Sequence, residues 1–207
     1  MILPFLALLA QATTPAPVST PAPVATPTPA PAADPALAPV KVRLDTAAGP
    51  IVLAVDRAHA PLTAANFLRY VDGRKLDGIA FYRAVKVGDG YGLAQFGTRN
   101  DPKRTLPPVP FEPTSKTGLS HVDGAISMAM AKPGTAAGDF FVVVGDLKSM
   151  DAHDADPGFA VFGRVIEGMD VIRRVLLAPT SPTEGVGVMK GQMLAPTIRI
   201  ASARRVP

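Results

Sequence analysis

Two hydrophobic segments within residues 124–145 follow different patterns. In the first, Ile126, Met128 and Met130 alternate with Ala125, Ser127 and Ala129, which is the two-residue period of a half-buried strand with unlike faces. The second, residues 140–144, is an unbroken aromatic and β-branched run, typical of a strand buried on both sides. Residues 132–138 between them are rich in turn formers. We expect these two strands to lie at the centre of the fold.

The N-terminal part of the remaining pattern predicts a hairpin and a helix. Residues 40–45 and 50–55 alternate on either side of a turn that contains Gly49, and their apolar positions give each strand one buried face. Pro61 is tolerated in the first turn of a helix, because its missing N–H has no partner there. An apolar stripe that includes Leu62, Ala65 and Phe67 follows, and Gly73 is a plausible end of this helix.

Further elements follow along the chain. Residues 78–87 predict a strand in which Arg83 shares a face with Phe81 and Val85. Four glycines between residues 88 and 97 indicate a loop. Residues 159–165 predict a strand, 168–176 an amphipathic helix, 178–196 a long loop and 197–203 a closing strand. Seven or eight strands with two helices favour a closed barrel or a sandwich, since both hide strand edges.

Composition divides the chain into three parts. Residues 1–12 form an apolar run that ends in Ala10-Gln11-Ala12, which has the small-x-small form of a signal-peptidase site. We expect a signal peptide cleaved after Ala12 and a periplasmic or otherwise exported protein without a membrane span after cleavage. No Lys or Arg precedes the apolar run, so an uncleaved apolar tail is the alternative.

Residues 13–39 alternate proline with Ala, Val and Thr. Proline fixes its own backbone torsion and lacks an N–H, so this segment cannot form a helix and should be an extended, disordered linker. Nearly all charged residues follow it, and residues 40–207 should form one folded domain.

Charge and residue types exclude several functions. The chain has no cysteine, which rules out disulfides, thiolate catalysis and Cys-ligated metals. Its net charge of +4 comes from scattered Lys and Arg, so we expect no nucleic-acid partner. The acidic residues of 146–156, with His153 among them, do not match the EF-hand spacing; we expect a solvated loop and no metal site.

Several motifs together resemble the cyclophilin-type peptidyl-prolyl cis-trans isomerases. They are Phe81-Tyr82-Arg83, Gln95, Gly124-Ala-Ile-Ser-Met-Ala, Phe140-Phe141-Val142 and Phe159-Ala-Val-Phe-Gly-Arg-Val-Ile-Glu-Gly-Met-Asp170, and they occur in the family's order and spacing. The resemblance covers residues 40–206. It implies a mainly β fold, a closed eight-stranded antiparallel β-barrel capped by two α-helices.

The resemblance also implies the site. Arg83 matches the family's catalytic arginine, Phe141 the aromatic floor of the proline pocket, and Gln95 the glutamine that binds the substrate backbone. Other residues that line the substrate site by position are Leu93, Ala129, Met150 and Phe159.

The chain departs from the family pattern at several positions. The segment between Arg83 and Gln95 is about four residues longer than usual. Tyr82 stands where the family usually has His, Asp139 where it has Gln, Ser149 where it has Trp, and Phe159 where it often has His. Asp139 lies next to the pocket in sequence and could either pair with Arg83 or repel acidic substrates.

The implied function is isomerisation of X–Pro bonds in proline-containing polypeptides during folding, by a monomer that needs no cofactor. The alternative is a non-catalytic peptide-binding chaperone or scaffold on the same barrel. A hydrolase built on Ser120 and His121 with Asp123 is a third option, which we discount because adjacent residues rarely point at each other.

Overall fold

The computed structural model describes residues 37–207. The predicted signal peptide, residues 1–12, and residues 13–36 of the predicted linker lie outside this range. The strands are β1 (Val40–Thr46), β2 (Gly49–Val55), β3 (Ala80–Gly88), β4 (Tyr91–Gly97), β5 (Ala125–Met128), β6 (Asp139–Val144), β7 (Ala160–Glu167), β8 (Thr180–Ser181) and β9 (Met193–Val206). The helices are α1 (Pro61–Asp72), α2 (Thr114–Thr117) and α3 (Met169–Leu177), with short 3-10 turns at Lys148–Met150 and Gly187–Met189.

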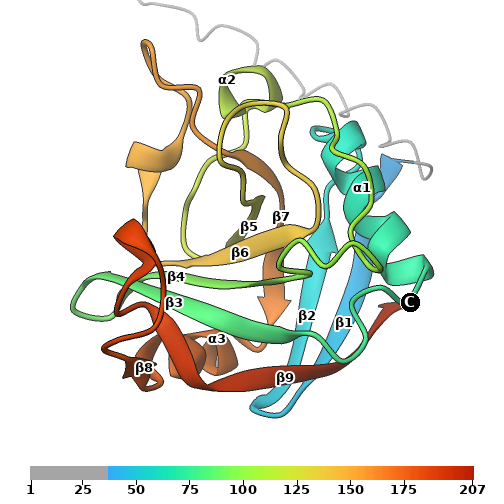
Figure 1. The fold of residues 1–207 in the computed structure, drawn as a ribbon. Coiled ribbons are helices and arrows are strands. Elements are labelled where there is room, and N and C mark those ends of the chain that lie inside the picture. The colour runs from blue at the N-terminus through green and yellow to red at the C-terminus, as the bar shows by residue number, and fades with distance from the viewer. Residues whose placement is uncertain (1–36) are drawn as a thin grey trace, which may run out of the picture. The chain divides into compact units, whose positions relative to one another are not determined.

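The strands close into a ring. Hydrogen bonding follows the order β1-β2-β7-β5-β6-β4-β3-β9, and β9 returns to pair with β1. All these pairings are antiparallel, and the two-residue β8 is added beside β9. The predicted eight-stranded antiparallel barrel is therefore confirmed (Figure 1). Closure pairs every strand of the ring on both sides, which removes exposed sheet edges.

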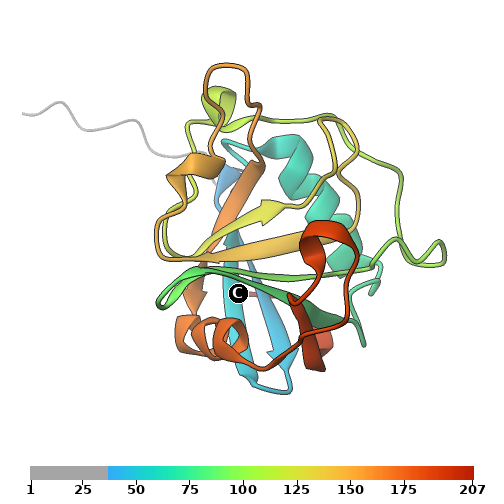
Figure 2. The ribbon, with the colours of Figure 1, turned by 60° about the vertical axis from the view of Figure 1, so that its left-hand side comes forward.

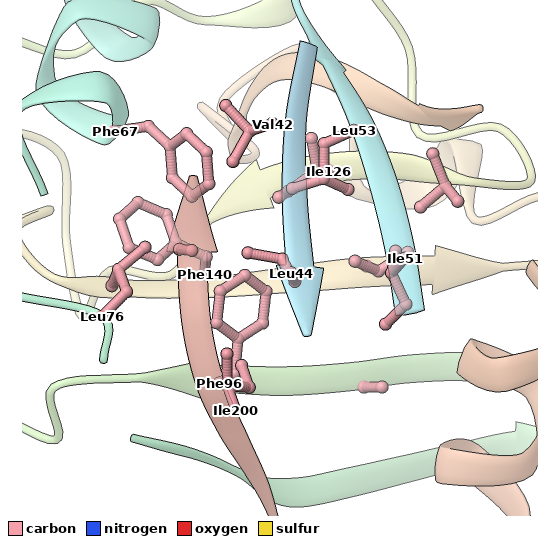
Figure 3. Packing of buried hydrophobic residues seen from close by; sticks show 14 of the residues in the cluster. Val42, Leu44, Ile51, Leu53, Phe67, Leu76, Phe96, Ile126, Phe140 and Ile200 are labelled. Atoms are coloured by element: carbon pink, nitrogen blue, oxygen red, sulfur yellow. The ribbon is translucent and has the colours of Figure 1, made fainter. Parts of the chain in front are cut away.

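The barrel interior is filled by large apolar side chains from almost every strand. The predicted hairpin is present, with Leu44 opposite Ile51 and both fully buried. Phe140 lies at the centre of an aromatic group, with its ring centroid 5.0 Å from that of Phe67 and 5.7 Å from that of Phe96. Figure 3 shows Phe67 reaching this group from α1, and Phe140 and Phe96 from the neighbouring strands β6 and β4.

Helices α1 and α3 pack on different parts of the barrel. Helix α1 lies against β7 and β9, and α3 lies against β2, β3, β4 and β6 (Figures 1 and 2). Gly73 follows α1 directly, as predicted. The predicted stripe was partly wrong, since Leu62 is 49% exposed and Ala65 also faces solvent. Phe67 and Leu68 of the predicted stripe are buried as expected, together with Ala64. Leu62 lies about 200° around the helix from Ala64 and therefore faces away from the barrel.

The predicted loop at residues 88–97 is wrong. Tyr91–Gly97 is strand β4, which forms a tight hairpin with β3 and pairs on its other side with β6. Glycine is required there for close packing and not for a loop. At Gly92, with φ +154°, a Cβ atom would lie 2.0 Å from the carbonyl oxygen of Val85. The extra residues after Arg83 therefore lengthen a hairpin.

Two other predictions need correction. All four residues of β5 are buried, so this strand is not half-buried, because a second apolar layer covers its outer face. Ala129 and Met130 lie beyond its end. The predicted loop 178–196 contains β8 and the first residues of β9, which begins at Met193. The buried strand at residues 140–144 is confirmed as β6.

Candidate functional site

A second apolar cluster lies on the outer face of the barrel, separate from its interior. Strands alternate their side chains between the two faces, so Phe140 and Val142 point inward while Phe141 and Val143 point outward. The outer cluster is formed by Leu93, Ala125, Phe141, Val143, Leu147 and Val161, with Val85, Leu119, Ala129, Met150 and Phe159 packed against it. Five of the residues implied by the resemblance thus meet on one surface: Leu93, Ala129, Phe141, Met150 and Phe159.

Arg83 reaches this face through a β-bulge. Phe81 pairs with Phe96, and Arg83 pairs with Gln95, so Tyr82 is an extra residue in β3. Phe81 is in the interior, whereas the side chains of Tyr82 and Arg83 both contact Gln95 on the outside. The prediction that Arg83 shares a face with Phe81 is therefore wrong. Bulges often re-aim a side chain beside an active site, and this one aims Arg83 toward the outer cluster.

Two side-chain amides hold the guanidinium of Arg83. Its Nη1 donates to Oε1 of Gln95 at 3.0 Å. Its Nε and Nη2 donate to Oε1 of Gln192 at 2.9 and 2.6 Å. The backbone of Gln192 is itself fixed, because its carbonyl accepts the N–H of Ala84 at 2.9 Å. Arg83 is half-buried, and burial lowers its pKa from the usual value.

Gln192 was not anticipated from the sequence. It lies 109 residues from Arg83, at the end of a segment predicted to be a loop. A glutamine in such a segment carries no sequence signal for a role beside an arginine. Only the packing of this segment against β3 reveals the contact.

Asp139 does not pair with Arg83. Its Oδ1 accepts the hydroxyl of Tyr82 at 2.9 Å and the backbone N–H of Arg99 at 3.0 Å. The guanidinium of Arg99 lies over the Tyr82 ring, 5.2 Å from its centroid. Burial is the main cause that raises the pKa of Asp139, and burial followed by the Asp139 charge raises the pKa of Tyr82 well above its usual range.

Three aromatic rings form the floor of the outer cluster. Phe141 is 2% exposed, and its ring meets that of Phe159 edge-on, with centroids 5.5 Å apart and planes at 88°. The imidazole of His121 stacks on Phe141, with centroids 5.9 Å apart and planes at 12°. Phe141 is thus packed against both of the other rings, and the half-buried Phe159, Ala129 and Met150 are more exposed members of the cluster.

A buried polar network holds the His121 ring at both of its nitrogens. Nδ1 of His121 lies 2.6 Å from Oδ1 of Asp151, and Nε2 lies 3.0 Å from Oγ of Ser127. Asp151 also accepts hydrogen bonds from the backbone N–H of His121 and from the hydroxyl of Ser120. Burial is the main cause that lowers the pKa of His121.

This Ser-His-Asp arrangement is structural. His121 and Ser127 are fully buried, so no substrate carbonyl can reach the oxygen of Ser127. Ser120, the serine of the discounted hydrolase, donates its hydroxyl to Asp151 and not to His121. Asp123, the acid of the discounted triad, instead binds Arg173 at 2.7 Å and the backbone N–H of Gly145 at 2.8 Å. Within residues 37–207 no group of three or more His, Cys, Asp or Glu side chains is arranged to hold a metal ion.

Two recesses elsewhere on the domain do not include this face. One, of about 320 Å³, lies where β2 meets α3 and is lined by Arg43, Glu167 and Arg174. The other, of about 420 Å³, lies along α1 near Leu37 and Arg205. Both lack Arg83 and the aromatic floor, so the outer cluster remains the candidate site.

The family model for "Cyclophilin type peptidyl-prolyl cis-trans isomerase/CLD" matches residues 40–204. The chain belongs to the cyclophilin-type peptidyl-prolyl cis-trans isomerases. This cyclophilin is 32% identical over 147 residues to a peptidyl-prolyl cis-trans isomerase of Acinetobacter baylyi, which covers 70% of this chain and 77% of the relative. It is 33% identical over 153 residues to peptidyl-prolyl cis-trans isomerase A of Dickeya dadantii, with 73% and 77% covered.

A solved structure supports the same fold. The cyclophilin-type isomerase of Cryptosporidium parvum, crystallised in the presence of the dipeptide Ala-Pro, superposes with a TM-score of 0.64 at 20% identity. The match covers 81% of this cyclophilin and 99% of that chain. At this identity the comparison speaks for the fold, and the roles of individual side chains must be argued from their geometry.

Proposed function

We propose that this cyclophilin isomerises X–Pro bonds on its outer face, with Arg83 as the catalytic group and the cluster around Phe141 as the proline pocket. The observation that carries the proposal is the position of Arg83, held by two amide oxygens beside an apolar aromatic floor. Gln95 would bind the substrate backbone, and Leu93, Ala129, Met150 and Phe159 would line the site. Asp139 lies at the edge of this surface and would act through its hydrogen bonds with Tyr82 and with the backbone of Arg99.

Isomerisation needs no cofactor. Resonance gives the peptide bond its rotational barrier, about 18–20 kcal/mol, and uncatalysed X–Pro exchange takes tens to hundreds of seconds. As the bond twists, the lone pair of the prolyl nitrogen localises and becomes a better hydrogen-bond acceptor. A donor at that nitrogen is therefore more favourable in the transition state than in the ground state, which is the condition for catalysis.

Arg83 retains the donors for this task. A guanidinium has five N–H groups, and the three hydrogen bonds to Gln95 and Gln192 leave two of them free. Since both neutral partners offer only oxygen, they orient the cation without cancelling its charge. The apolar cluster would bind the proline ring and exclude water, which strengthens the remaining hydrogen bond.

The experiment compares wild type with Arg83→Ala in an NMR exchange assay on an X–Pro peptide. We expect kcat/KM to fall about 100- to 1,000-fold, the usual effect of removing one charge-stabilising donor. Arg83→Lys should restore little, because an ammonium cannot reproduce the planar fork. Arg174→Ala, on the exposed side of α3, is the matched control and should keep full activity. An unchanged rate in Arg83→Ala would overturn the assignment.

The same assay addresses the non-catalytic alternative. The departures from the family pattern at Tyr82 and Asp139 favour it, since Tyr82 bonds to Gln95 and Asp139 bonds to Tyr82. A scaffold would bind the peptide while exchanging it no faster than buffer does. Measurable acceleration by wild type excludes that alternative.

We further propose that residues 1–12 are a signal peptide and residues 13–39 a linker, so that a monomeric domain acts on proline-containing polypeptides in the periplasm. The apolar N-terminal run and the Ala10-Gln11-Ala12 sequence support export. The scattered basic residues support the expectation that nucleic acid is not a partner. Among residues 37–207, no helix is long and apolar enough to cross a membrane. N-terminal sequencing after cell fractionation should give Thr13; an intact Met1 in the cytosol would contradict export.

A further inference from the structure

A chain of hydrogen bonds connects Arg83 to Asp139. Nη1 of Arg83 donates to Oε1 of Gln95 at 3.0 Å, and Nε2 of Gln95 donates to the hydroxyl oxygen of Tyr82 at 2.7 Å. The Tyr82 hydroxyl donates to Oδ1 of Asp139 at 2.9 Å. All three bonds run in the same direction, from the cation toward the carboxylate.

The direction of this chain is set at its acidic end. A carboxylate accepts hydrogen bonds only, so the Tyr82 hydroxyl must be the donor in its bond to Asp139. The oxygen of Tyr82 is then free to accept from Gln95. A glutamine side chain has a donor end and an acceptor end, and this bond fixes which end faces Tyr82. Its oxygen must therefore face Arg83; the flipped amide would point N–H groups at the guanidinium.

We propose that Asp139 and Tyr82 are positioning residues for Arg83, acting through the orientation of Gln95. This role deepens the function proposed above, since it rests on Arg83 as the catalytic group. Neither residue needs to touch the substrate. The two departures from the family pattern, Tyr82 and Asp139, work as a pair, because the Tyr82 hydroxyl connects Asp139 to Gln95.

The surroundings of Asp139 fit a fixed anchor. The backbone N–H of Arg99 donates to the same oxygen, and its guanidinium covers the Tyr82 ring. Tyr70 of α1 and Arg83 of β3 are further ionisable groups near this corner, and burial, followed by the Asp139 charge, raises the pKa of Tyr70. Burial raises the pKa of Asp139, so the anchor should protonate at a higher pH than an ordinary aspartate.

NMR provides a test that does not depend on catalysis. In wild type, the guanidinium ¹H–¹⁵N resonances of Arg83, assigned by their loss in Arg83→Lys, should shift with pH as the Asp139 carboxyl titrates. Asp139→Asn should abolish this shift. Tyr82→Phe breaks the chain but leaves the charge in place, so the shift should shrink at least about threefold while the carboxyl ¹³C signal still titrates. Asp170→Asn, a remote exposed acid paired with Arg174, is the control and should match wild type.

Kinetics provide the second readout. Tyr82→Phe and Asp139→Asn should each lower kcat about 3- to 10-fold with KM changed less than about twofold, because they disturb the geometry of Arg83 in the transition state. The effects of substitutions within one hydrogen-bond chain are not additive. The kcat of the double variant should therefore lie within about twofold of the kcat of the slower single variant. Thermal unfolding confirms that each variant is folded at the assay temperature.

The outcomes separate the two proposals. If Arg83→Ala is inactive but Tyr82→Phe and Asp139→Asn have wild-type kcat, the positioning role is wrong and the catalytic assignment stands. Arg83→Ala could stay active while, in the wild-type protein, the Arg83 resonances still shift with the titration of Asp139 and this shift depends on Tyr82. In that case the hydrogen-bond chain stands and the catalytic assignment fails. Equal Arg83 shifts in wild type and Tyr82→Phe would show a direct field effect and overturn the chain.

Discussion

Arg83 and Gln95 face each other on neighbouring strands, with Nη1 of the arginine 3.0 Å from Oε1 of the glutamine. This contact exists because the bulge at Tyr82 turns Arg83 out of the barrel. Gln192, which precedes β9, completes the support from the other side. The geometry of Arg83, the proposed catalytic group, therefore depends on β3, β4 and a segment more than a hundred residues away.

Substitution of Gln192 should affect activity in a charge-dependent way. Gln192→Ala removes two hydrogen bonds from Arg83, so we expect kcat to fall about 3- to 10-fold. Gln192→Glu keeps an acceptor in place but adds a negative charge beside the guanidinium, which should weaken the donor further. The exchange assay should rank the glutamate variant below the alanine variant, and the reverse order would argue against electrostatic catalysis by Arg83.

Neighbouring phenylalanines on β6 should behave differently. Phe140 points into the barrel and Phe141 into the outer cluster, so both Phe→Leu variants should lose about 1–2 kcal/mol of unfolding free energy. Only Phe141→Leu changes the proposed proline pocket, and it should raise KM several-fold. Urea unfolding and steady-state kinetics on the pair check this. Equal KM values would place the pocket elsewhere.

The β3–β4 hairpin should not tolerate a side chain at Gly92. A Cβ there would lie 2.0 Å from the Val85 carbonyl oxygen, so Gly92→Ala must distort the pairing and should cost more than about 2 kcal/mol. Gly90 is the matched control. It also has positive φ, at +77°, but a Cβ added there would have no atom within 4 Å, so Gly90→Ala should cost only about 1–2 kcal/mol. Equal costs in urea unfolding would contradict the steric argument.

The stability of the domain should fall in mild acid because of His121. Burial holds the pKa of this imidazole below 6.5, its usual value, so the native state resists a proton that the unfolded chain accepts. The free energy of unfolding should therefore decrease as the pH falls below about 6.5, by at most about 1.4 kcal/mol per pH unit from this group. His121→Asn should remove this contribution, whereas His153→Asn, on an exposed loop, should leave it in place. A wild-type slope in His121→Asn would refute the prediction.

Asp139 should act in the opposite sense. Its pKa is raised in the native state, so its contribution to stability is fully present below 3.8, the usual value, and is lost as the pH rises through the raised pKa. Asp139→Asn should thus make the acid-side decline of the whole domain steeper. Unfolding free energies of wild type and variant between pH 4 and pH 7 test the sign, and a shallower decline in the variant would show that the carboxyl is not desolvated as described.

Short-range patterns in the sequence were sufficient for much of the fold. The alternation in residues 40–55 predicted the β1–β2 hairpin, and the apolar run at 140–144 predicted β6, because burial on one or both faces directly selects these residue types. Strand β4 was missed, since its glycines meet close backbone approaches that only the paired strands create. Leu62 was misplaced because helical spacing alone does not say which apolar residues face the barrel.

The candidate site, like the fold, was predicted only in part from the sequence. The sequence alone, through its motifs, named Arg83, Gln95 and Phe141 and predicted the closed barrel that carries them. Only the tertiary structure decided which face Arg83 occupies, that Gln192 holds it, and that Asp139 bonds to Tyr82. The physical reason is that a bulge shifts the alternation of a strand by one residue, and hydrogen-bond partners are chosen by proximity in space, which residue spacing along the chain does not encode.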